Sequence, residues 1–421
     1  MTKSYKLLIC LFVLIAVITA YISCTDGGDF DVYLQAARQL SKRQNIYVPP
    51  FVKGLQYYYS VFFALILSPV GSYIFATEFA WLLLSYCFLF RIMKLMKAYF
   101  NIDVLSNKQQ IIWFVLSVIL SLQFLMYDVS LIQVTIFLLW SILESLQLIR
   151  NDREILGGML LATAINIKIM PILMLPYLFY RGYFKSVVTA VLFFIILLYL
   201  PAIFIGWKYN NFLLAEWWKV INPGNKEHMF ELGIGTHSIV AMLPVYLTPT
   251  VGEMPYRRNI VNIDYSTIGV VINATRVLLL GISLFFFKTL PFKRENNTLK
   301  MFWEAAYFML LIPLLLPHQQ KYNFLLVLPM IVYLLYFFIS KKWALTSIPF
   351  IIALVVFSLS MVIFSPIYGS DIIGGFLFRL TQHYRFMTFA TLFIIPVALI
   401  CNPGQLENLK TIKGTRHIFE P

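Results

Sequence analysis

Two acidic residues stand directly after the first apolar segment of the chain, and their chemistry is the clearest starting point. Asp29 and Asp31 lie two residues apart between glycines and aromatic residues. A carboxylate at such a position can take the proton from an attacking hydroxyl, and a carboxylate pair can bind a divalent cation. The structural alternative is that either acid caps the helix that follows, in which case the helix dipole would lower its pKa and weaken it as a base.

Basic and polar residues elsewhere could act on an anionic group. Lys168 interrupts an apolar run over residues 156–180, and a charge in such a run usually faces a cavity or marks a site. A second group is the short polar turn between two late apolar segments, and His237 lies in a long polar stretch before it. Cations and protonated histidines can hold a phosphate as it leaves, although a lone histidine is more often a packing or surface residue. The residues of the late turn are His318, Gln319, Lys321 and Tyr322.

Several other chemistries are not indicated by the sequence. The four cysteines show no metal-ligand spacing, and no P-loop or G-x-G-x-x-G pattern opens a helix. The net charge of +14 is spread through short loops, as the positive-inside rule expects, so it does not predict a nucleic-acid partner.

The composition defines the class of protein. Of 421 residues, 60% are hydrophobic and only 12% are charged, against roughly 25% charged in soluble domains. Apolar runs of about 18 to 24 residues recur along the chain, which is the length that spans a bilayer. The sequence therefore predicts an all-α polytopic integral membrane protein in which residues 1–421 form a single transmembrane domain.

The expected topology has about twelve membrane helices, some short or broken, with both termini inside. Residues 24–56 form the first outer loop, whose stretch 29–41 has the one-sided apolar pattern of a juxtamembrane helix. Residues 207–266 form a long outer loop, in which 238–247 is apolar enough to touch the membrane. We expect 57–70 to be a half-helix that dips into the outer leaflet, and 156–180 to be a bent hairpin. This topology places the acids, His237 and the late turn on the outer face.

Several short patterns resemble a known family. The first outer loop and the segment after it resemble the opening of bacterial glycosyltransferase family 87. The patterns are Asp29-Phe30-x-x-Tyr33-x-x-Ala36-Ala37, Asn45-x-Tyr47, and Tyr59-x-x-Phe62 through Leu67-x-Pro69. Looser matches are Gln133 after a short turn, Lys168-x-x-Pro171, Thr236-His237-Ser238 and the late turn. The chain departs from the family at Tyr58-Tyr59-Ser60, where the family has Tyr-Pro-Pro, and at Ile132, where the family often has glycine before the glutamine.

This resemblance implies a GT-C fold and an inverting glycosyl transfer. The donor would be a polyprenyl-phosphate sugar, with mannose as the family default, and the acceptor a glycolipid or glycan at the outer face of the bacterial cytoplasmic membrane. The base of the family maps onto Asp29, with Asp31 as the second candidate. The donor carries one phosphate and the family works without a metal or other cofactor, although the Asp29-x-Asp31 spacing leaves a divalent ion open. The residues expected to bind substrate are Tyr33, Lys168, His237, His318, Gln319, Lys321 and Tyr322.

Three other functions are alternatives to this one. A flippase or transporter of lipid-linked sugars would predict repeat symmetry and charges along a path through many helices. An O-antigen-type polymerase would rely on arginine-rich outer loops, whereas the long loop here has only Arg257 and Arg258. A purely structural membrane protein would leave the acids unexplained. The sequence favours the glycosyltransferase.

Overall fold

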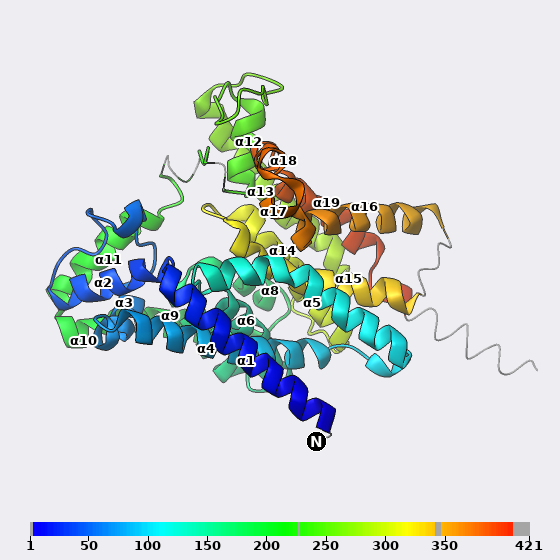
Figure 1. Ribbon diagram of the computed structural model, residues 1–421, viewed down its shortest axis with the longest axis horizontal. Helices are drawn as coiled ribbons and strands as arrows, with labels where there is room; N and C mark the ends of the chain where they lie inside the picture. The colour runs from blue at the N-terminus through cyan, green and yellow to red at the C-terminus, as the bar shows by residue number, and fades with distance from the viewer. Residues whose placement is uncertain (1–2, 226–227, 229, 234, 342–346, 407–421) are drawn as a thin grey trace, which may run out of the picture. The chain divides into compact units, whose positions relative to one another are not determined.

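The computed structural model describes residues 3–225, 228, 230–233, 235–341 and 347–406. Every regular element among these residues is a helix (Figure 1). Lys342, which the expected topology places on the inner side, and the C-terminal tail after residue 406 lie outside the described residues.

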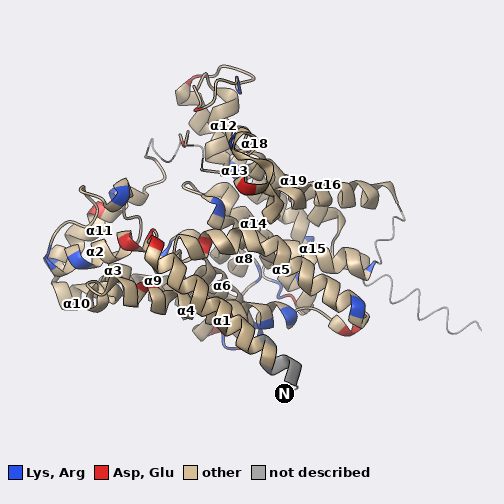
Figure 2. Ribbon diagram, viewed as in Figure 1, with Lys and Arg blue, Asp and Glu red and all other residues tan. Residues whose placement is uncertain are grey.

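Seven of the described helical segments are long and apolar enough to cross a membrane, and one bent pair would make an eighth. Charged residues lie mainly in loops and near helix ends (Figure 2). The chain is therefore a multi-pass membrane protein, as predicted, but its long helices alone do not reach the expected twelve. The long segments are α1 (Lys3–Asp26), α4 (Ile74–Lys97), α5 (Asn107–Ser130), α9 with α10 (Phe184–Tyr199, Pro201–Ile205), α13 (Tyr265–Phe287), α14 (Thr298–Leu315) and η6 with α15 (Lys321–Val327, Leu328–Ser340).

The remaining apolar helices are shorter. The bent pair is α18 (Gly375–His383) with α19 (Phe386–Ile400), which meet at 60°. Five further helices have 7 to 17 residues, fewer than the roughly 20 that a simple span needs. They are α3 (Val61–Leu67), α6 (Thr135–Arg150), α7 (Glu154–Ile167), α8 (Met174–Tyr180) and α16 (Ile348–Phe364).

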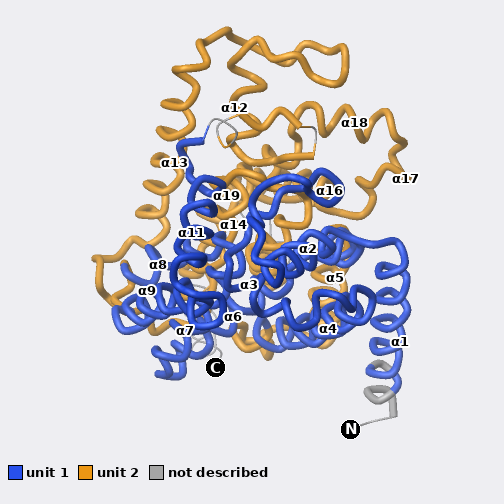
Figure 3. Tube along the Cα trace, turned by 90° about the vertical axis from the view of Figure 1, so that its left-hand side faces the viewer, with its two compact units in different colours: residues 1–96, 125–179, 183–225 blue, residues 97–124, 180–182, 226–421 orange. Residues whose placement is uncertain are grey.

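The chain divides into two compact units (Figure 3). Unit 1 comprises residues 1–96, 125–179 and 183–225, and unit 2 comprises residues 97–124, 180–182 and 226–421. The stretch 207–266, expected as one long outer loop, is divided between them. Its helix α11 (Trp207–Ile221) belongs to unit 1, and its helix α12 (Ile239–Leu247) belongs to unit 2.

In unit 1 the helix predicted over 29–41 is present as α2 (Phe30–Ser41). Its apolar residues are buried against the protein, largely on α3, rather than left exposed for a lipid surface. Arg38 on its polar side donates to the carbonyl of Gly71 at 2.9 Å, which ties the helix to the turn after α3. The element α2 is thus part of the core of unit 1.

Two predicted interruptions are also found in unit 1. The stretch 57–70 contains only the seven-residue helix α3 and the 3-10 turn Ser68–Val70, which together are too short for a simple span. The run over 156–180 breaks at Lys168, whose backbone is extended (φ −145°, ψ 127°) between α7 and the 3-10 turn Met170–Leu173. The predicted break at Lys168 is confirmed.

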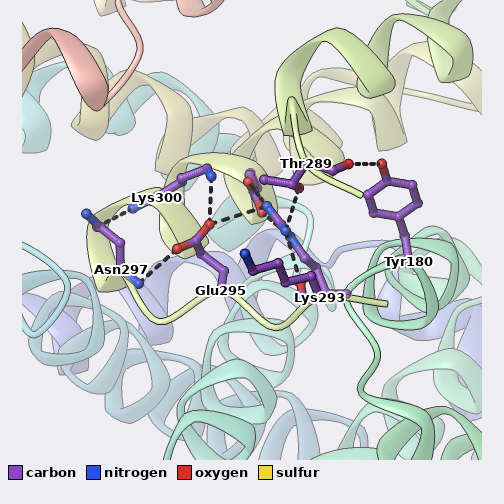
Figure 4. A network of polar contacts seen from close by, with 8 residues as sticks. Tyr180, Thr289, Lys293, Glu295, Asn297 and Lys300 are labelled. Carbon is purple, nitrogen blue, oxygen red and sulfur yellow. Dashed lines mark hydrogen bonds and ion pairs between the residues drawn. The ribbon is translucent and has the colours of Figure 1, made fainter. Parts of the chain in front are cut away.

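In unit 2 the most completely buried helices are α14 and α15. The segment Tyr180–Gly182 is fastened to this unit by a buried ionic network (Figure 4). Arg181 is 1% exposed, and its guanidinium makes two hydrogen bonds to the carboxylate of Glu304, which is fully buried. The guanidinium also donates to the Thr289 hydroxyl at 2.8 Å, while Glu295 lies 3.5 Å from Arg181 and 2.7 Å from Lys300. Such a network fixes the segment, because every charge in it has a partner of opposite sign.

Candidate active site

The backbone around Asp29 packs directly against the turn between α5 and α6. The amide of Asp29 donates to the carbonyl of Leu131 at 2.9 Å. A Cβ atom on Gly28 would lie 2.5 Å from that carbonyl oxygen, which is closer than real Cβ contacts come. Only glycine at position 28 allows this approach. The approach brings Asp29 close to Gln133, which binds its side chain.

The Asp29 side chain does not cap its helix. The residue precedes α2 with φ −71° and ψ −11°, and its carboxylate accepts no hydrogen bond from the first turn. Instead Oδ2 accepts from the amide Nε2 of Gln133 at 2.6 Å. The structural alternative considered for Asp29, a helix cap, is therefore wrong.

The electrostatic consequence is also the reverse of the one that capping implied. Burial raises the pKa of Asp29, and the nearby carboxylate of Asp31 adds to the rise. The ammonium groups of Lys53 and Lys168 and the Gln133 amide oppose it by favouring the charged form. A carboxylate with a raised pKa binds a proton more readily, which suits it to act as a general base.

Asp31 has a different environment. Its Oδ2 lies 3.2 Å from Nζ of Lys53, which also donates to the carbonyl of Gly28 at 3.0 Å. The Asp31 carboxylate is thus engaged in an ion pair, and the same lysine contacts the loop both before and after Asp29. Within the described part of the chain, no three His, Cys, Asp or Glu side chains come together as a possible metal site.

Tyr33 and Lys168 lie in the same unit and the same neighbourhood. The Tyr33 hydroxyl donates to Oε1 of Gln133 at 3.0 Å and is 2.5 Å from the hydroxyl of Tyr59. Nζ of Lys168 lies 5.7 Å from the centre of the Tyr59 ring. Unit 1 therefore brings together four of the predicted site residues: Asp29, Asp31, Tyr33 and Lys168.

The other predicted site residues form a second cluster, in unit 2. The amide of His237 donates to the carbonyl of Gln319 at 2.8 Å, which joins the long loop to the late turn. Burial lowers the pKa of His237 well below its usual value, and the cations Arg385 and Lys321 lower it further. His237 is accordingly neutral and could bind a ligand only as a hydrogen-bonding partner, not as a cation.

The late turn has an unusual backbone. His318 is in the left-handed region at φ 57°, and its amide donates to Oε1 of Glu231. The same oxygen lies 3.2 Å from Nδ1 of the His318 ring. Lys321 is 5% exposed, and its ammonium lies 4.0 Å from the centre of the Phe378 ring. Tyr322 follows in the 3-10 turn and is also buried.

Some residues of these clusters were missed as site residues by sequence reasoning. Gln133 stood out only through the resemblance, although its position directly after a short turn is a usable signal. Tyr59 lies in one of the patterns that carry the resemblance, but the pattern assigns it no role. Lys53 and Glu231 are single charges in loops, and nothing in the local sequence indicates which acid or turn each would contact.

The helices together define a multi-pass membrane protein, and its first loop carries a half-buried acid held by a hydrogen bond. The family model of glycosyltransferase family 87 matches residues 57–317, more than half of the chain, and the chain belongs to this family. The resemblance found in the sequence is thus confirmed, and the protein is a glycosyltransferase. No curated protein and no solved structure matches the chain. Gln133, Lys168 and His237 lie within the matched region, whereas Asp29 precedes it and His318 follows it.

Proposed function

We propose that the protein is an inverting glycosyltransferase that uses a polyprenyl-phosphate sugar, with mannose as the family default. The acceptor is a hydroxyl of a glycolipid or glycan, and Asp29 is the general base. The observation that carries this proposal is the Asp29 carboxylate, half-buried, held by Gln133 and raised in pKa by burial.

The reaction follows from these groups. The acceptor oxygen attacks the anomeric carbon, and its proton passes to the Asp29 carboxylate as the new C–O bond forms. The bond from the anomeric carbon to the phosphate oxygen breaks on the opposite face, so the configuration inverts and polyprenyl phosphate leaves as an anion. Within unit 1, Lys168 is the proposed partner of that phosphate, and Tyr33 supports the base. The residues of the unit 2 cluster, His318, Lys321, neutral His237, Gln319 and Tyr322, are proposed to bind substrate by virtue of the resemblance.

The proposed setting is the bacterial cytoplasmic membrane, with both termini inside and the site on the outer face. We propose a GT-C-type fold of about twelve membrane segments in one transmembrane domain, including the short helices α6, α7, α8 and α16, with α3 as a half-helix in the outer leaflet. The lipid bilayer then supplies both the donor and a lipid-linked acceptor, and no nucleic acid takes part.

The transfer is proposed to need no metal ion or other cofactor. The ion pair with Lys53 engages Asp31, the second acid of the Asp29-x-Asp31 spacing. Activity of the purified enzyme should therefore be the same with and without a chelator such as EDTA. A loss of activity that is restored by Mg²⁺ or Mn²⁺ would overturn this part of the proposal.

The test of the base is the pair of variants Asp29→Asn and Asp31→Asn, assayed in membranes against a panel of polyprenyl-phosphate sugars. Removal of a general base lowers the rate by about 10²–10⁴-fold, and we expect that loss for Asp29→Asn only. Asp31→Asn serves as the matched control, because it removes a neighbouring charge of the same kind. Full activity of Asp29→Asn, at normal expression, would refute the assignment, and the panel identifies the sugar.

A further inference from the structure

A chain of hydrogen bonds leads from the buried aromatic residues of unit 1 to the Asp29 carboxylate. The hydroxyls of Tyr59 and Tyr33 are 2.5 Å apart, and the Tyr33 hydroxyl is 3.0 Å from Oε1 of Gln133. Nε2 of Gln133 is 2.6 Å from Oδ2 of Asp29. Four side chains from three separate parts of the sequence thus end at the proposed base.

The direction of each bond follows from the chemistry of the groups. The amide oxygen of Gln133 can only accept, so the single proton of the Tyr33 hydroxyl is donated to it. The contact between the two tyrosines must then be donated by Tyr59. With its oxygen occupied by Tyr33, the amide presents its N–H to Asp29. A flipped amide would place an oxygen against the carboxylate and leave Tyr33 facing a donor.

The side chains that form this row of hydrogen bonds are held rigidly. Gln133, Tyr33 and Tyr59 are 1%, 2% and 7% exposed. The backbone carbonyl of Gln133 accepts from the indole nitrogen of Trp81 at 3.0 Å, which fixes the residue from the other side. The rings of Tyr33 and Tyr59 pack edge to face with their centres 4.4 Å apart. Buried side chains in such contacts have little freedom to reorient.

We infer that Gln133 is a positioning residue for Asp29, and that Tyr33 and Tyr59 act through it by fixing the orientation of its amide. This inference rests on the proposed function, in which Asp29 is the base. Because Gln133 occupies Oδ2, the structure assigns Oδ1 to the acceptor hydroxyl. Every hydrogen bond in this row is donated toward Asp29. The row therefore orients the carboxylate and does not carry a proton away from it.

Gln133 also stabilises the charged form of Asp29. The charged groups that act on Asp29 are Lys53 and Lys168, which favour the carboxylate, and Asp31, which disfavours it. The Tyr59 hydroxyl is a further titratable group that interacts with the Asp29 charge. The amide adds a hydrogen bond to the charged form and so opposes the effect of burial on the pKa. Loss of the amide should therefore leave Asp29 both less well oriented and protonated up to a higher pH.

The test compares Gln133→Met and Tyr33→Phe with Tyr57→Phe in steady-state kinetics across pH. Gln133→Met removes the donor while keeping the side chain's length. We expect kcat to fall by up to about 10²-fold with KM nearly unchanged, since misplacement of a catalytic group by about 1 Å has that effect. The acidic limb of the kcat/KM profile should move to higher pH. Tyr33→Phe should lower kcat and move the acidic limb to higher pH as well, each by less than Gln133→Met does.

Tyr57→Phe is the matched control. This buried tyrosine belongs to the same aromatic cluster, but its hydroxyl donates to the carbonyl of Ser60 and takes no part in the hydrogen bonds that lead to Asp29. Its kcat and pH profile should equal those of the wild type. If Gln133→Met does not fold, Tyr33→Phe carries the test alone. A wild-type kcat and pH profile in the folded variants, with Asp29→Asn inactive, would overturn the inference and leave the proposed function intact. An active Asp29→Asn would instead overturn both.

Discussion

Asp29 combines two properties that usually oppose each other in a carboxylate. Its Oδ2 accepts a hydrogen bond from Gln133, which favours ionisation, and yet burial raises its pKa. The carboxylate is therefore held in place without becoming too weak to accept a proton. A helix cap would have held it equally well but would have lowered its basicity.

Lys53 offers a way to change the pKa of Asp29 from outside the hydrogen-bond chain. After burial, its ammonium is the strongest influence on that pKa, and it acts to lower it. Replacing Lys53 by methionine should therefore raise the pKa of Asp29 further. The acidic limb of the kcat/KM profile should then lie at higher pH, with the largest loss of activity in acidic buffer.

The matched control for this prediction is Lys53→Arg, which keeps the positive charge. Its profile should follow the wild type. An acidic limb that moves to lower pH in Lys53→Met, or does not move, would show that the lysine charge does not act on the base.

The sequence allowed the acid to be selected but not its partners. The resemblance to the family, through the spacing of Asp29, Phe30 and Tyr33, indicated which carboxylate to choose, because such a pattern can be read from the sequence alone. The hydrogen bond from Gln133 spans more than a hundred positions and depends on how a turn and a loop approach each other. The ion pair between Asp31 and Lys53 likewise depends on the path of the loop after α2.

Among the elements, the short turn between α5 and α6 has more influence on the site than its length suggests. Leu131 binds the backbone of Asp29 and Gln133 binds its side chain. Ile132 between them adopts φ 51°, which is uncommon for a β-branched residue. The turn therefore positions the loop that carries the proposed base.

A substitution at Gly28 tests whether the close approach of this loop to the turn is required. In Gly28→Ala the new Cβ would meet backbone atoms of Leu131, which cannot move aside as a flexible side chain could. Asp29 should be displaced from Gln133, and kcat should fall by about 10²-fold while the protein remains in the membrane. Measurement of kcat alongside expression level checks this.

Gly71→Ala is a suitable control for Gly28→Ala, because its Cβ would make only ordinary contacts at 3.4 Å or more. We expect it to retain most of the activity. Equal activity of the two variants would show that the close approach at Gly28 is not required.

The elements themselves were predicted unequally well. The helix α2 and the break at Lys168 followed from an apolar period and from a charge with prolines, both local signals. The burial of α2 against α3 did not follow, because a one-sided apolar pattern is the same whether the helix packs on protein or on lipid. The helix α11 was missed within an expected loop, since its many polar residues hide its buried face.

For the whole molecule, the multi-pass membrane class was predicted from composition and is confirmed by the helices of the structure, while most of the division into two units had no sequence signal. The units are built from segments that alternate along the chain. The boundary after Asn225 follows Pro223-Gly224, but the boundary after Phe124 falls inside helix α5, where the usual signs of a domain boundary are absent.

The network at Arg181 should contribute strongly to the stability of unit 2. Arg181→Met would leave the fully buried carboxylate of Glu304 without its cation, and loss of one partner of a buried pair typically costs about 3–5 kcal/mol. We expect a clearly lower midpoint of thermal unfolding in detergent.

The double variant Arg181→Met with Glu304→Leu should recover most of that loss, because an apolar pair of similar volume replaces the ion pair. Glu295 keeps its contact with Lys300 in both variants. A double variant that is no more stable than Arg181→Met would show that the network is not organised around the pair.

The alternation of segments has a consequence for biosynthesis. When residue 225 has been made, every segment of unit 1 is available, but residues 97–124 are already in place without their partners. Trp113 donates to the carbonyl of Val332 and Gln109 to that of Ile339, more than two hundred positions later. The first half of α5 must therefore wait in the membrane until α15 is synthesised. The order in which this chain is translated differs from the order in which it can assemble, so a nascent chain stopped before α15 holds a complete unit 1 beside an unpaired helix.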